Sequence, residues 1–478
     1  MSSIPRRARR RATTVGSWAA VTLVASALVL SACSTASTPS ASPAAVGKTN
    51  DLAFAVVDTS QSKCYNNDAE IDCPQAGEAF SGQDAQFSEN PTSYTNNGDG
   101  TVTDHVTGLM WQQAMSDKVS YADAISGASV QTTGGYSDWR VPTIKELYSL
   151  MNFNGTDISA SSSGTVVPFI DSVFGFTYPD TSGGNRPINS QWVTSTEYVS
   201  TVLNNDKCFF GVNFVDGRIK CYPEAARQGS DGKDYYVRYV RNADGATTST
   251  YGINSFSDQG NGTVKDAATG LTWAQKDSGK SMNWQSALAY CSALDAGGVD
   301  DWRLPNAKEL QSIVDYSRSP ATTKSAAIDP IFSSTKITDE AGKTDWGFYW
   351  TSTTHISTVN VSDAVYIVFG RGMGYMEEYG GWIDVHGAGS QRSDPKVAAA
   401  SGTQASSSTQ PSGGTQPTGA PGGTPPTGGP GGTPPAGAPS GGPSTGSETP
   451  SNGNASQQGA QHDAIRTDNL VRCVSSGH

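Results

Sequence analysis

The apolar positions of the chain form the same order of helix and strand patterns twice. In each half, an apolar set at helical spacing is followed by a second helix pattern and then by alternating strand patterns. The first helix pattern lies at 121–125 in one half and at 284–294 in the other. The strand patterns lie at 191–199, 209–222, 235–241, 349–355 and 364–369. Two helices followed by strands predict an α+β fold with an antiparallel sheet in each half.

Turn and capping signals mark the boundaries of these elements. Asp-Gly at 99–100 and Asn-Gly at 261–262 tolerate positive φ and therefore predict hairpin turns. A polar residue with a glutamate three positions later predicts a capping box at the start of each second helix. The two pairs are Thr143 with Glu146 and Asn306 with Glu309.

Matching motifs indicate that the two halves are copies of one domain. Each motif recurs in the same order, with an offset of 162 residues for the first and 163 for the last. The matched segments are 98–104 with 260–266, 107–111 with 269–273, and 138–142 with 301–305. A period this long indicates two tandem domains rather than a solenoid.

The last strand of the second copy is separated from the rest of that copy. The first copy closes with a strand pattern at 236–240, and its nearest match lies at 470–474. The intervening stretch is rich in Pro, Gly, Ser and Thr, which predicts a disordered insert; the alternative is a terminal linker with an unstructured end. The predicted division is a signal peptide at 1–32, a flexible tether at 33–50, a first domain at 51–245, the main part of the second at 246–396, the insert at 397–460 and the last strand at 461–478.

The first residues of the chain carry an export signal. Five arginines between positions 6 and 11 precede an apolar run at 15–30 that is short for a membrane span. Ser31 and Ala32 then precede Cys33 in an order that resembles a lipobox, where the cysteine is diacylated after cleavage. We therefore expect an exported protein held in the cell envelope by lipid at Cys33, in the outer membrane or at the cell surface. An ordinary signal peptide or an uncleaved anchor helix is the alternative.

The charge of the chain disfavours broad electrostatic binding. The sequence has 32 basic and 44 acidic residues and a net charge of −12. Removal of the signal with its five arginines leaves 27 basic residues and a net charge of −17. Because this charge disfavours diffuse binding to nucleic acid or anionic lipid, we expect no nucleic-acid partner.

The remaining cysteines predict disulfide bonds. Six remain once Cys33 is assigned to the lipid, and an even number in an exported chain is typical of disulfides. Cys291 and Cys473 are both present in the second copy, and both are absent from the equivalent positions of the first. This joint presence and absence is expected for two cysteines that form a disulfide. The expected pairs are Cys64 with Cys73, Cys208 with Cys221, and Cys291 with Cys473. No C-x-x-C or H-x-x-x-H spacing occurs, and we expect no metal site and no cofactor.

One of these pairs conflicts with simple hairpin geometry. A tight turn at 216–217 would place Cys221 opposite Val212 rather than Cys208. The Cys208–Cys221 pair therefore requires a bent or bulged hairpin.

At these motifs the chain resembles the C-terminal domain of the collagen-like adhesin of Legionella, the Lcl C-terminal domain. The resemblance rests on segments 97–104, 107–111, 301–305 and 471–473 and covers 57–242 and 255–474. It implies a C-type-lectin-like fold, similar also to formylglycine-generating enzymes, in which a helix cysteine often bridges to the final strand. Cys291 and Cys473 match that pattern. The founding adhesin is associated with sulfated polysaccharides and host surfaces, whereas this chain is acidic and lacks collagen-like repeats.

A dense group of polar residues in the second copy is the candidate ligand-binding set, because binding residues favour loops on a rigid scaffold. The group consists of Arg371, Tyr375, Asp384, His386, Arg392 and Asp394. The alternative is a solvated loop with ordinary turn hydrogen bonds. The two Asp-Trp-Arg motifs instead predict a structural role, with a buried tryptophan and an arginine held by a carboxylate of the next helix. These residues are Trp139, Arg140, Trp302 and Arg303.

The sequence contains no catalytic constellation that stands out from ordinary surface chemistry. Formylglycine-generating chemistry needs a reactive cysteine pair, and the assignment of every cysteine to structure leaves none. The leading hypothesis is therefore a non-catalytic surface module that binds a glycan or extracellular matrix. The alternatives are an envelope enzyme with a formylglycine-generating-like fold and a structural component of a surface assembly.

Overall fold

The computed structural model describes residues 52–160, 165–181, 186–203, 205–225, 233–398 and 463–477. All of these lie in one unit, Asn50–His478. The predicted signal segment, Cys33, the tether, and the insert beyond residue 398 lie outside the described residues. Within the described ranges, no helix is both long enough and apolar enough to cross a membrane.

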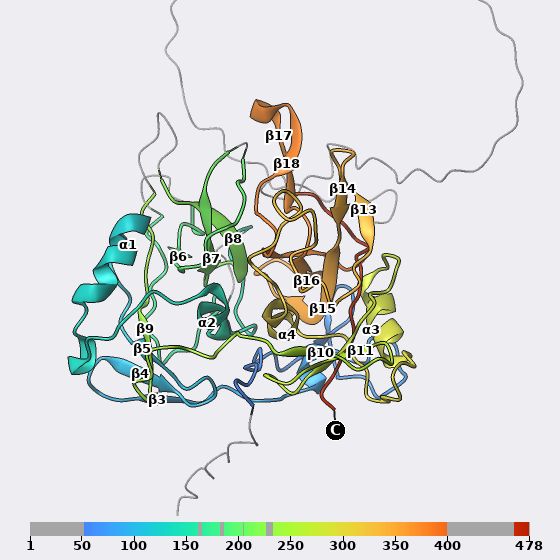
Figure 1. The fold of residues 1–478 in the computed structure, drawn as a ribbon, viewed down its shortest axis with the longest axis horizontal. Coiled ribbons are helices and arrows are strands. Elements are labelled where there is room, and N and C mark those ends of the chain that lie inside the picture. The colour runs from blue at the N-terminus through green and yellow to red at the C-terminus, as the bar shows by residue number, and fades with distance from the viewer. Residues whose placement is uncertain are drawn as a thin grey trace, which may run out of the picture. The chain divides into compact units, whose positions relative to one another are not determined.

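Each copy has its own antiparallel sheet of four strands (Figure 1), with the orders β3-β4-β5-β9 and β10-β11-β12-β20. In the first copy the strands are β3 (Tyr94–Asn96), β4 (Thr101–Asp104), β5 (Leu109–Gln112) and β9 (Val240–Asn242). In the second they are β10 (Phe256–Asp258), β11 (Thr263–Asp266), β12 (Thr272–Ala274) and β20 (Val474–Ser475). The predicted turns at 99–100 and 261–262 connect the first two strands of each sheet.

The fourth strand of the second sheet comes from beyond the insert. Val474 of β20 pairs with Trp273, as Val240 of β9 pairs with Trp111 in the first copy. Both sheets therefore close in the same way, although the closing strands are separated from their sheets by very different lengths of chain. The observed strand β20 begins only at the last residue of the predicted strand 470–474.

Short helices start where the sequence places polar caps. They are α1 (Tyr121–Gly127), α2 (Ile144–Ser149), α3 (Trp284–Ser292) and α4 (Ala307–Ser312). At α2 the Thr143 hydroxyl accepts the Glu146 N–H, and the Glu146 carboxylate accepts the Thr143 N–H. Asn306 and Glu309 form the same capping box at α4, so both predicted boxes are present. Short 3-10 helices are η1 (Asp84–Gln86), η2 (Ala128–Val130), η3 (Thr133–Gly135) and η5 (Glu377–Tyr379).

A six-stranded sheet, ordered β15-β16-β19-β8-β7-β6, is shared between the two copies. Its strands are β6 (Gln191–Trp192), β7 (Cys208–Asn213), β8 (Arg218–Pro223), β15 (Phe348–His355), β16 (Asp363–Val368) and β19 (Gln391–Pro395). Gln391 of β19 pairs with Ile219 of β8 at the junction. The sequence predicted a separate antiparallel sheet for each copy. In the structure, β8 of the first copy and β19 of the second pair with each other, so neither strand is left with an unpaired edge.

Two-stranded hairpins account for the other described strands. They are β1 (Cys64–Tyr65) with β2 (Glu70–Ile71), β13 (Lys336–Thr338) with β14 (Thr344–Trp346), and β17 (Met373–Met376) with β18 (Gly381–Asp384). The β17–β18 hairpin stands at the top of Figure 1 near β13 and β14. The segment 371–394, interpreted from the sequence as a loop, thus contains β17, β18 and β19. Its many glycines interrupt the alternating apolar pattern by which a strand is recognised.

The three expected disulfide pairs are present, with Cα–Cα distances of 5.0 Å for Cys64–Cys73, 5.4 Å for Cys208–Cys221 and 5.4 Å for Cys291–Cys473. The predicted bend or bulge between β7 and β8 is wrong, because their register runs without a shift from Cys208↔Pro223 to Asn213↔Arg218. A four-residue turn at 214–217 replaces the tight turn and places Cys221 opposite Phe210. Cys208 and Cys221 are therefore diagonal neighbours on one face of the hairpin.

The N-terminal segment 52–90, which the sequence assigned to the first copy, contacts both copies. The Gln61 amide donates to the Phe153 carbonyl of the first copy (3.3 Å) and to the Thr354 carbonyl of the second (2.8 Å). Further along, Asp84 accepts hydrogen bonds from the hydroxyls of Thr59 and Thr353. Because each contact satisfies a buried polar group, the segment is an integral connector between the copies.

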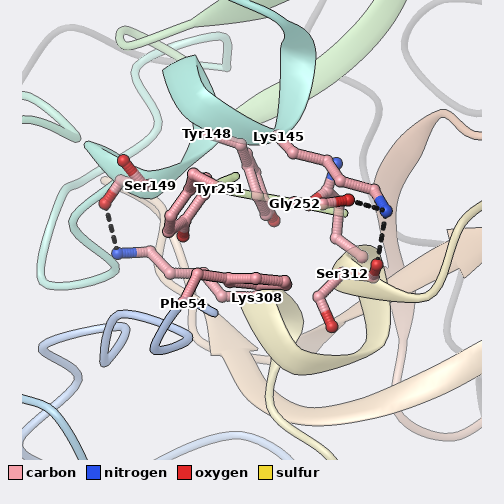
Figure 2. A pocket seen from close by; sticks show the side chains of 9 residues that line it. Phe54, Lys145, Tyr148, Ser149, Tyr251, Gly252, Lys308 and Ser312 are labelled. Atoms are coloured by element: carbon pink, nitrogen blue, oxygen red, sulfur yellow. Dashed lines mark hydrogen bonds between the residues drawn. The ribbon is translucent and has the colours of Figure 1, made fainter. Parts of the chain in front are cut away.

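Helices α2 and α4 meet through an exchange of lysine hydrogen bonds (Figure 2). Lys145 of α2 donates to the Ser312 carbonyl at the end of α4 (2.6 Å), and Lys308 of α4 donates to the Ser149 carbonyl at the end of α2 (2.8 Å). Lys145 and Lys308 occupy equivalent positions in the two copies, as do Ser149 and Ser312. Each ammonium thus caps carbonyls at a helix C-terminus, where positive charge is favoured.

Candidate functional site

The six residues of the predicted ligand-binding set do not lie together. Arg371 and Asp384 line a surface hollow, and Tyr375 lies on the adjacent hairpin, where its ring packs edge-on against Trp382 at 5.5 Å. The other three are buried on the inner side of the same region. They are His386, Arg392 and Asp394. Only Arg371, Tyr375 and Asp384 lie at or beside the hollow, so a ligand-binding role for the whole set stays a prediction.

The hollow has a volume of about 210 Å³ and is formed by both copies. The first copy contributes Thr201 and Asn205 from the loop before β7. The second contributes side chains from the β13–β14 turn and from the base of the β17–β18 hairpin. These include Asp339, Lys343, Arg371, Trp382 and Asp384. The hollow is lined mainly by polar side chains, with the Trp382 indole as its aromatic surface, and so differs from the mostly apolar lining typical of drug-binding pockets.

The loop from the first copy is fixed to the second copy by its backbone. The Leu203 N–H donates to the Asp384 carbonyl at 2.9 Å. Asn205 has a φ of 130°, a conformation that side-chain-bearing residues rarely adopt. Strain of this kind persists only where the surroundings determine the backbone, and it is concentrated at functional sites.

Arg371 is held in the hollow by acidic neighbours. Its Nη1 lies 3.3 Å from Asp339 Oδ2 and 3.6 Å from Asp345 Oδ1, and its side chain is 20% exposed. Its backbone N–H also donates to Asp345 Oδ2 at 2.9 Å. Burial raises the pKa of Asp345 to about 6, although Arg371 acts in the opposite direction. Because Arg371 already faces two carboxylates, its charge is largely compensated without a ligand.

Asp384 connects the hollow to the base of the hairpin. Its Oδ1 accepts the N–H groups of Gly372 (3.0 Å) and Gly387 (2.9 Å), and its Oδ2 accepts the Tyr198 hydroxyl (3.0 Å). Burial raises the pKa of Asp384 to about 7, which would suit a general acid. Both oxygens, however, already have partners within the fold. The geometry therefore favours a positioning role for Asp384 over proton transfer to a substrate.

The three buried residues of the set contact the C-terminal segment 463–477, which follows the predicted insert in the sequence. His386 Nε2 lies 2.5 Å from Asp463 Oδ1, and Arg392 forms an ion pair with the other oxygen of Asp463. Burial alone would raise the pKa of Asp463, but Arg392 and His386 outweigh it and hold that pKa well below its usual value. Asp394 accepts the Arg466 N–H at 2.8 Å. Burial raises the pKa of Asp394 well above its usual value. These three residues therefore have structural partners in the C-terminal segment.

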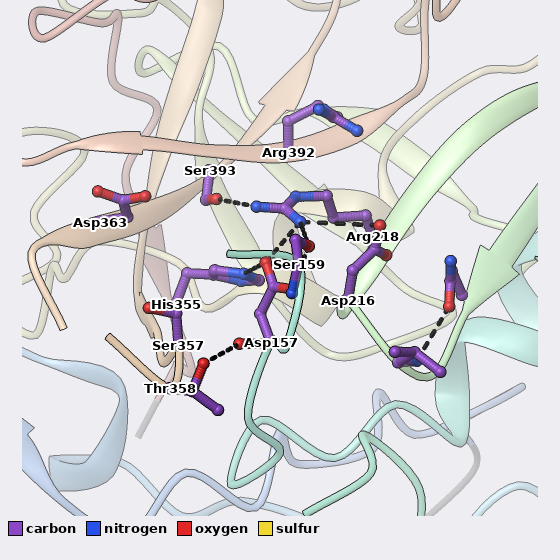
Figure 3. Close-up of polar contacts among 12 residues, drawn as sticks. Asp157, Ser159, Asp216, Arg218, His355, Ser357, Thr358, Asp363, Arg392 and Ser393 are labelled. Atoms are coloured by element: carbon purple, nitrogen blue, oxygen red, sulfur yellow. Dashed lines mark hydrogen bonds and ion pairs between the residues drawn. The ribbon is translucent and has the colours of Figure 1, made fainter. Parts of the chain in front are cut away.

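A second polar cluster lies at the junction between the copies and was not anticipated from the sequence. Figure 3 shows Asp157 between His355 and Arg218, at distances of 3.1 Å and 2.6 Å from the same carboxylate oxygen. The other oxygen accepts the Ser159 hydroxyl. The group contains Ser, His and Asp, but the hydroxyl contacts the carboxylate and not the imidazole. Nothing in the sequence signals it, because its members come from segments far apart in the chain.

The electrostatics of this cluster oppose base catalysis. Burial would raise the pKa of Asp157, but Arg218 and His355 outweigh that effect and lower it far below its usual value. A carboxylate with so low a pKa does not take a proton from a serine hydroxyl near neutral pH. The cluster instead joins β8 of the first copy to β15 and β19 of the second, since Arg218 also donates to the Ser393 hydroxyl at 3.1 Å.

The Asp-Trp-Arg residues have the structural role that their pattern indicated. Trp139 and Trp302 are buried, and their indole N–H groups donate to the Thr133 and Ala296 carbonyls. Each arginine forms two hydrogen bonds of 2.6–2.7 Å with the capping-box glutamate of the following helix. These pairs are Arg140 with Glu146 and Arg303 with Glu309. Among the described residues, no group of three or more His, Cys, Asp or Glu side chains could hold a metal ion.

The repeated sheets, the capped helices and the disulfides define a duplicated α+β protein with a hollow between its two copies. The family model described as the Lcl C-terminal domain matches residues 100–241 and again residues 262–382, which together are more than half of the chain. The chain therefore belongs to the Lcl C-terminal domain family and carries two copies of the domain. Comparisons with curated proteins and with solved structures found no match.

Proposed function

We propose that the chain is an exported protein, lipid-anchored at Cys33, that binds a saccharide without catalysis in the hollow between its two copies. The observation that carries the proposal is the partly exposed indole of Trp382 beside convergent polar side chains. An indole offers a flat apolar face for a sugar ring, and the polar groups supply hydrogen bonds for hydroxyls.

The charges of the hollow favour an uncharged saccharide over a sulfated one. Lys343 and Arg371 line the hollow together with Asp339, and Arg371 already contacts Asp339 and Asp345. A sulfated chain would have to displace these internal partners or approach an acidic protein against repulsion. The volume of about 210 Å³ is below the range of about 300–1,000 Å³ typical of ligand pockets, so we expect the hollow to hold a single sugar unit, free or within a longer glycan.

A C-type-lectin-like fold is the finer part of the proposal. It is supported by the Cys291–Cys473 bond, which joins helix α3 to the segment that ends in the last strand. Membrane attachment through Cys33 would present the hollow outside the cytoplasm, where envelope or matrix glycans are found.

A glycan array that includes neutral and sulfated polysaccharides tests the function at physiological salt. We expect saturable binding to neutral glycans that is lost with Trp382→Ala and kept with Tyr379→Ala. Tyr379 is the matched control because it lies on η5 at the tip of the same hairpin but does not line the hollow. A blank array for the folded protein would refute saccharide binding, whereas binding that survives Trp382→Ala would place the site elsewhere.

A further inference from the structure

The ammonium group of Lys145 contacts the side-chain amide of a residue in the link between the two copies. Lys145 Nζ lies 3.0 Å from Asn254 Oδ1, and it also donates to the carbonyls of Gly252 (3.0 Å) and Ser312 (2.6 Å). Figure 2 shows Lys145 reaching from α2 toward Gly252 and Ser312. Because Oδ1 is bonded to Cγ of Asn254, the lysine nitrogen also lies close to that amide carbon. The 3.0 Å contact with Oδ1 and a C=O bond of about 1.23 Å place Nζ within about 4.2 Å of Cγ, a small movement from the range of about 3–3.5 Å that precedes bond formation.

The Asn254 amide is fixed in orientation by a buried carboxylate. Its Nδ2 donates to Asp266 Oδ2 at 2.8 Å, while its Oδ1 faces the lysine. Asp266 is fully buried, and its Oδ1 accepts the N–H groups of Ser255 (2.8 Å) and Ala268 (3.1 Å). A flip of the amide would place its NH₂ group against the ammonium and its oxygen against the carboxylate, so only one orientation is stable.

The surroundings of Lys145 raise the neutral, reactive fraction of its amine above that of a solvated lysine, although the charged form still predominates at pH 7. Burial lowers the pKa of Lys145 to about 8, although Asp266 acts to raise it. About a tenth of such an amine is neutral at pH 7, far more than for a solvated lysine. The cavity beside Lys145 has a volume of about 10 Å³, enough for about one water molecule. Lys145 and Asn254 are both half-buried, so their contact is only partly shielded from bulk water.

We propose that Lys145 and Asn254 form an intramolecular isopeptide bond that joins helix α2 of the first copy to the link before the second. The neutral amine attacks Cγ of Asn254, the Nζ–Cγ bond forms, and the Cγ–Nδ2 bond breaks. The proton lost by Nζ passes to Nδ2, which leaves as ammonia. The proton passes directly from Nζ to Nδ2 while both nitrogens are bonded to Cγ, and Asp266 Oδ2, which contacts Nδ2, holds the leaving nitrogen in place. The reaction consumes no oxidant, reductant or cofactor.

The second copy contains a natural control for this chemistry. Lys308 occupies the equivalent position, and burial likewise lowers its pKa to about 8. Its hydrogen bonds, however, go to the backbone carbonyls of Asp58 and Ser149, both at 2.8 Å. Lys308 is more deeply buried than Lys145, and within the described part of the chain its hydrogen bonds go to backbone carbonyls and not to a side-chain amide, so it cannot form the bond.

Peptide mapping of the full chain, purified from its host and then reduced, denatured and digested, tests the proposal. We expect one linked species that contains Lys145 and Asn254 and is lighter than the two separate peptides by one ammonia, about 17 Da. The separate Lys145 and Asn254 peptides should be depleted to the same extent. Asn254→Ala should abolish the linked species, and Lys308→Arg should leave it unchanged.

The result for the unaltered chain decides the matter whether or not a variant folds. Before reduction, a map that shows all three disulfides establishes that the sample is folded. Recovery of the Lys145 and Asn254 peptides in full and unlinked from such a sample would overturn the proposal. A linked species that persists in Asn254→Ala would also overturn it, because the lysine would then be joined to another residue.

Discussion

Removal of the Cys291–Cys473 disulfide should destabilise the fold more than removal of either shorter bridge. The bond closes a loop of 182 residues, whereas Cys208–Cys221 closes one of 13. Loop-closure entropy then contributes about 5 kcal/mol for the long bridge and about 3 kcal/mol for the short one. All four cysteines are buried, so replacement of each pair by serine creates similar local defects and the difference of about 2 kcal/mol reflects loop length.

The assay is urea unfolding of the two double-serine variants, followed by tryptophan fluorescence. Trp273 pairs with Val474 of β20 and therefore reports on release of the C-terminal segment. At urea concentrations below the unfolding transition, a protease should cut Cys291→Ser/Cys473→Ser first within residues 463–477. Without the disulfide, only noncovalent contacts keep this segment in place, and they must offset the entropy cost of closing the long loop. Equal losses of stability in the two variants would refute the loop-entropy argument, as would a C-terminal segment that stays protected.

Two further predictions concern buried charge. Arg303→Ala should cost about 3–5 kcal/mol because it leaves Glu309 buried without its partner. Arg140→Ala should cost less, because the Arg140 side chain is 31% exposed against 5% for Arg303; equal losses in urea unfolding would contradict this. Burial raises the pKa of Asp84 to about 7 from an unfolded value near 4, so the folded state binds more protons between those values. Stability should therefore fall as pH rises from about 4 to 7, and Asp84→Asn should flatten that decline; an unchanged slope would show that Asp84 is not its source.

Local rules of the sequence were sufficient for much of the fold. The capping boxes at Thr143 and Asn306 depend on residues three positions apart, so their pattern is visible in the sequence itself. The pairing of Cys291 with Cys473 was visible because the duplication supplies an internal comparison: both cysteines are absent from the first copy. The same comparison identified the strand that closes the second sheet.

Contacts between the copies could not be predicted in this way. The shared sheet depends on the pairing of Ile219 with Gln391. The alternating pattern of a strand does not show which strand it pairs with, so either strand could equally have been the edge of its own sheet. The hollow likewise combines Asn205 with Trp382, two residues whose proximity follows only from that junction. The interpretation of Arg392 as a ligand-facing residue missed its burial, because its partner Asp463 lies beyond the insert.

The contacts of segments 52–90 and 463–477 with the second copy have a consequence for the order of events during synthesis. The first copy's four-stranded sheet is complete once residue 242 has emerged, since its strands lie within 94–242. The sheet of the second copy is complete only once residue 475 has emerged. The segment 52–90 emerges before either sheet, but it can form its hydrogen bonds with Thr353 and Thr354 only after those residues have been synthesised. A chain halted before its last dozen residues would thus present a finished first copy beside an open second one, with Cys291 still a free thiol. That thiol would distinguish incomplete from complete molecules for any quality-control system that senses unpaired cysteines.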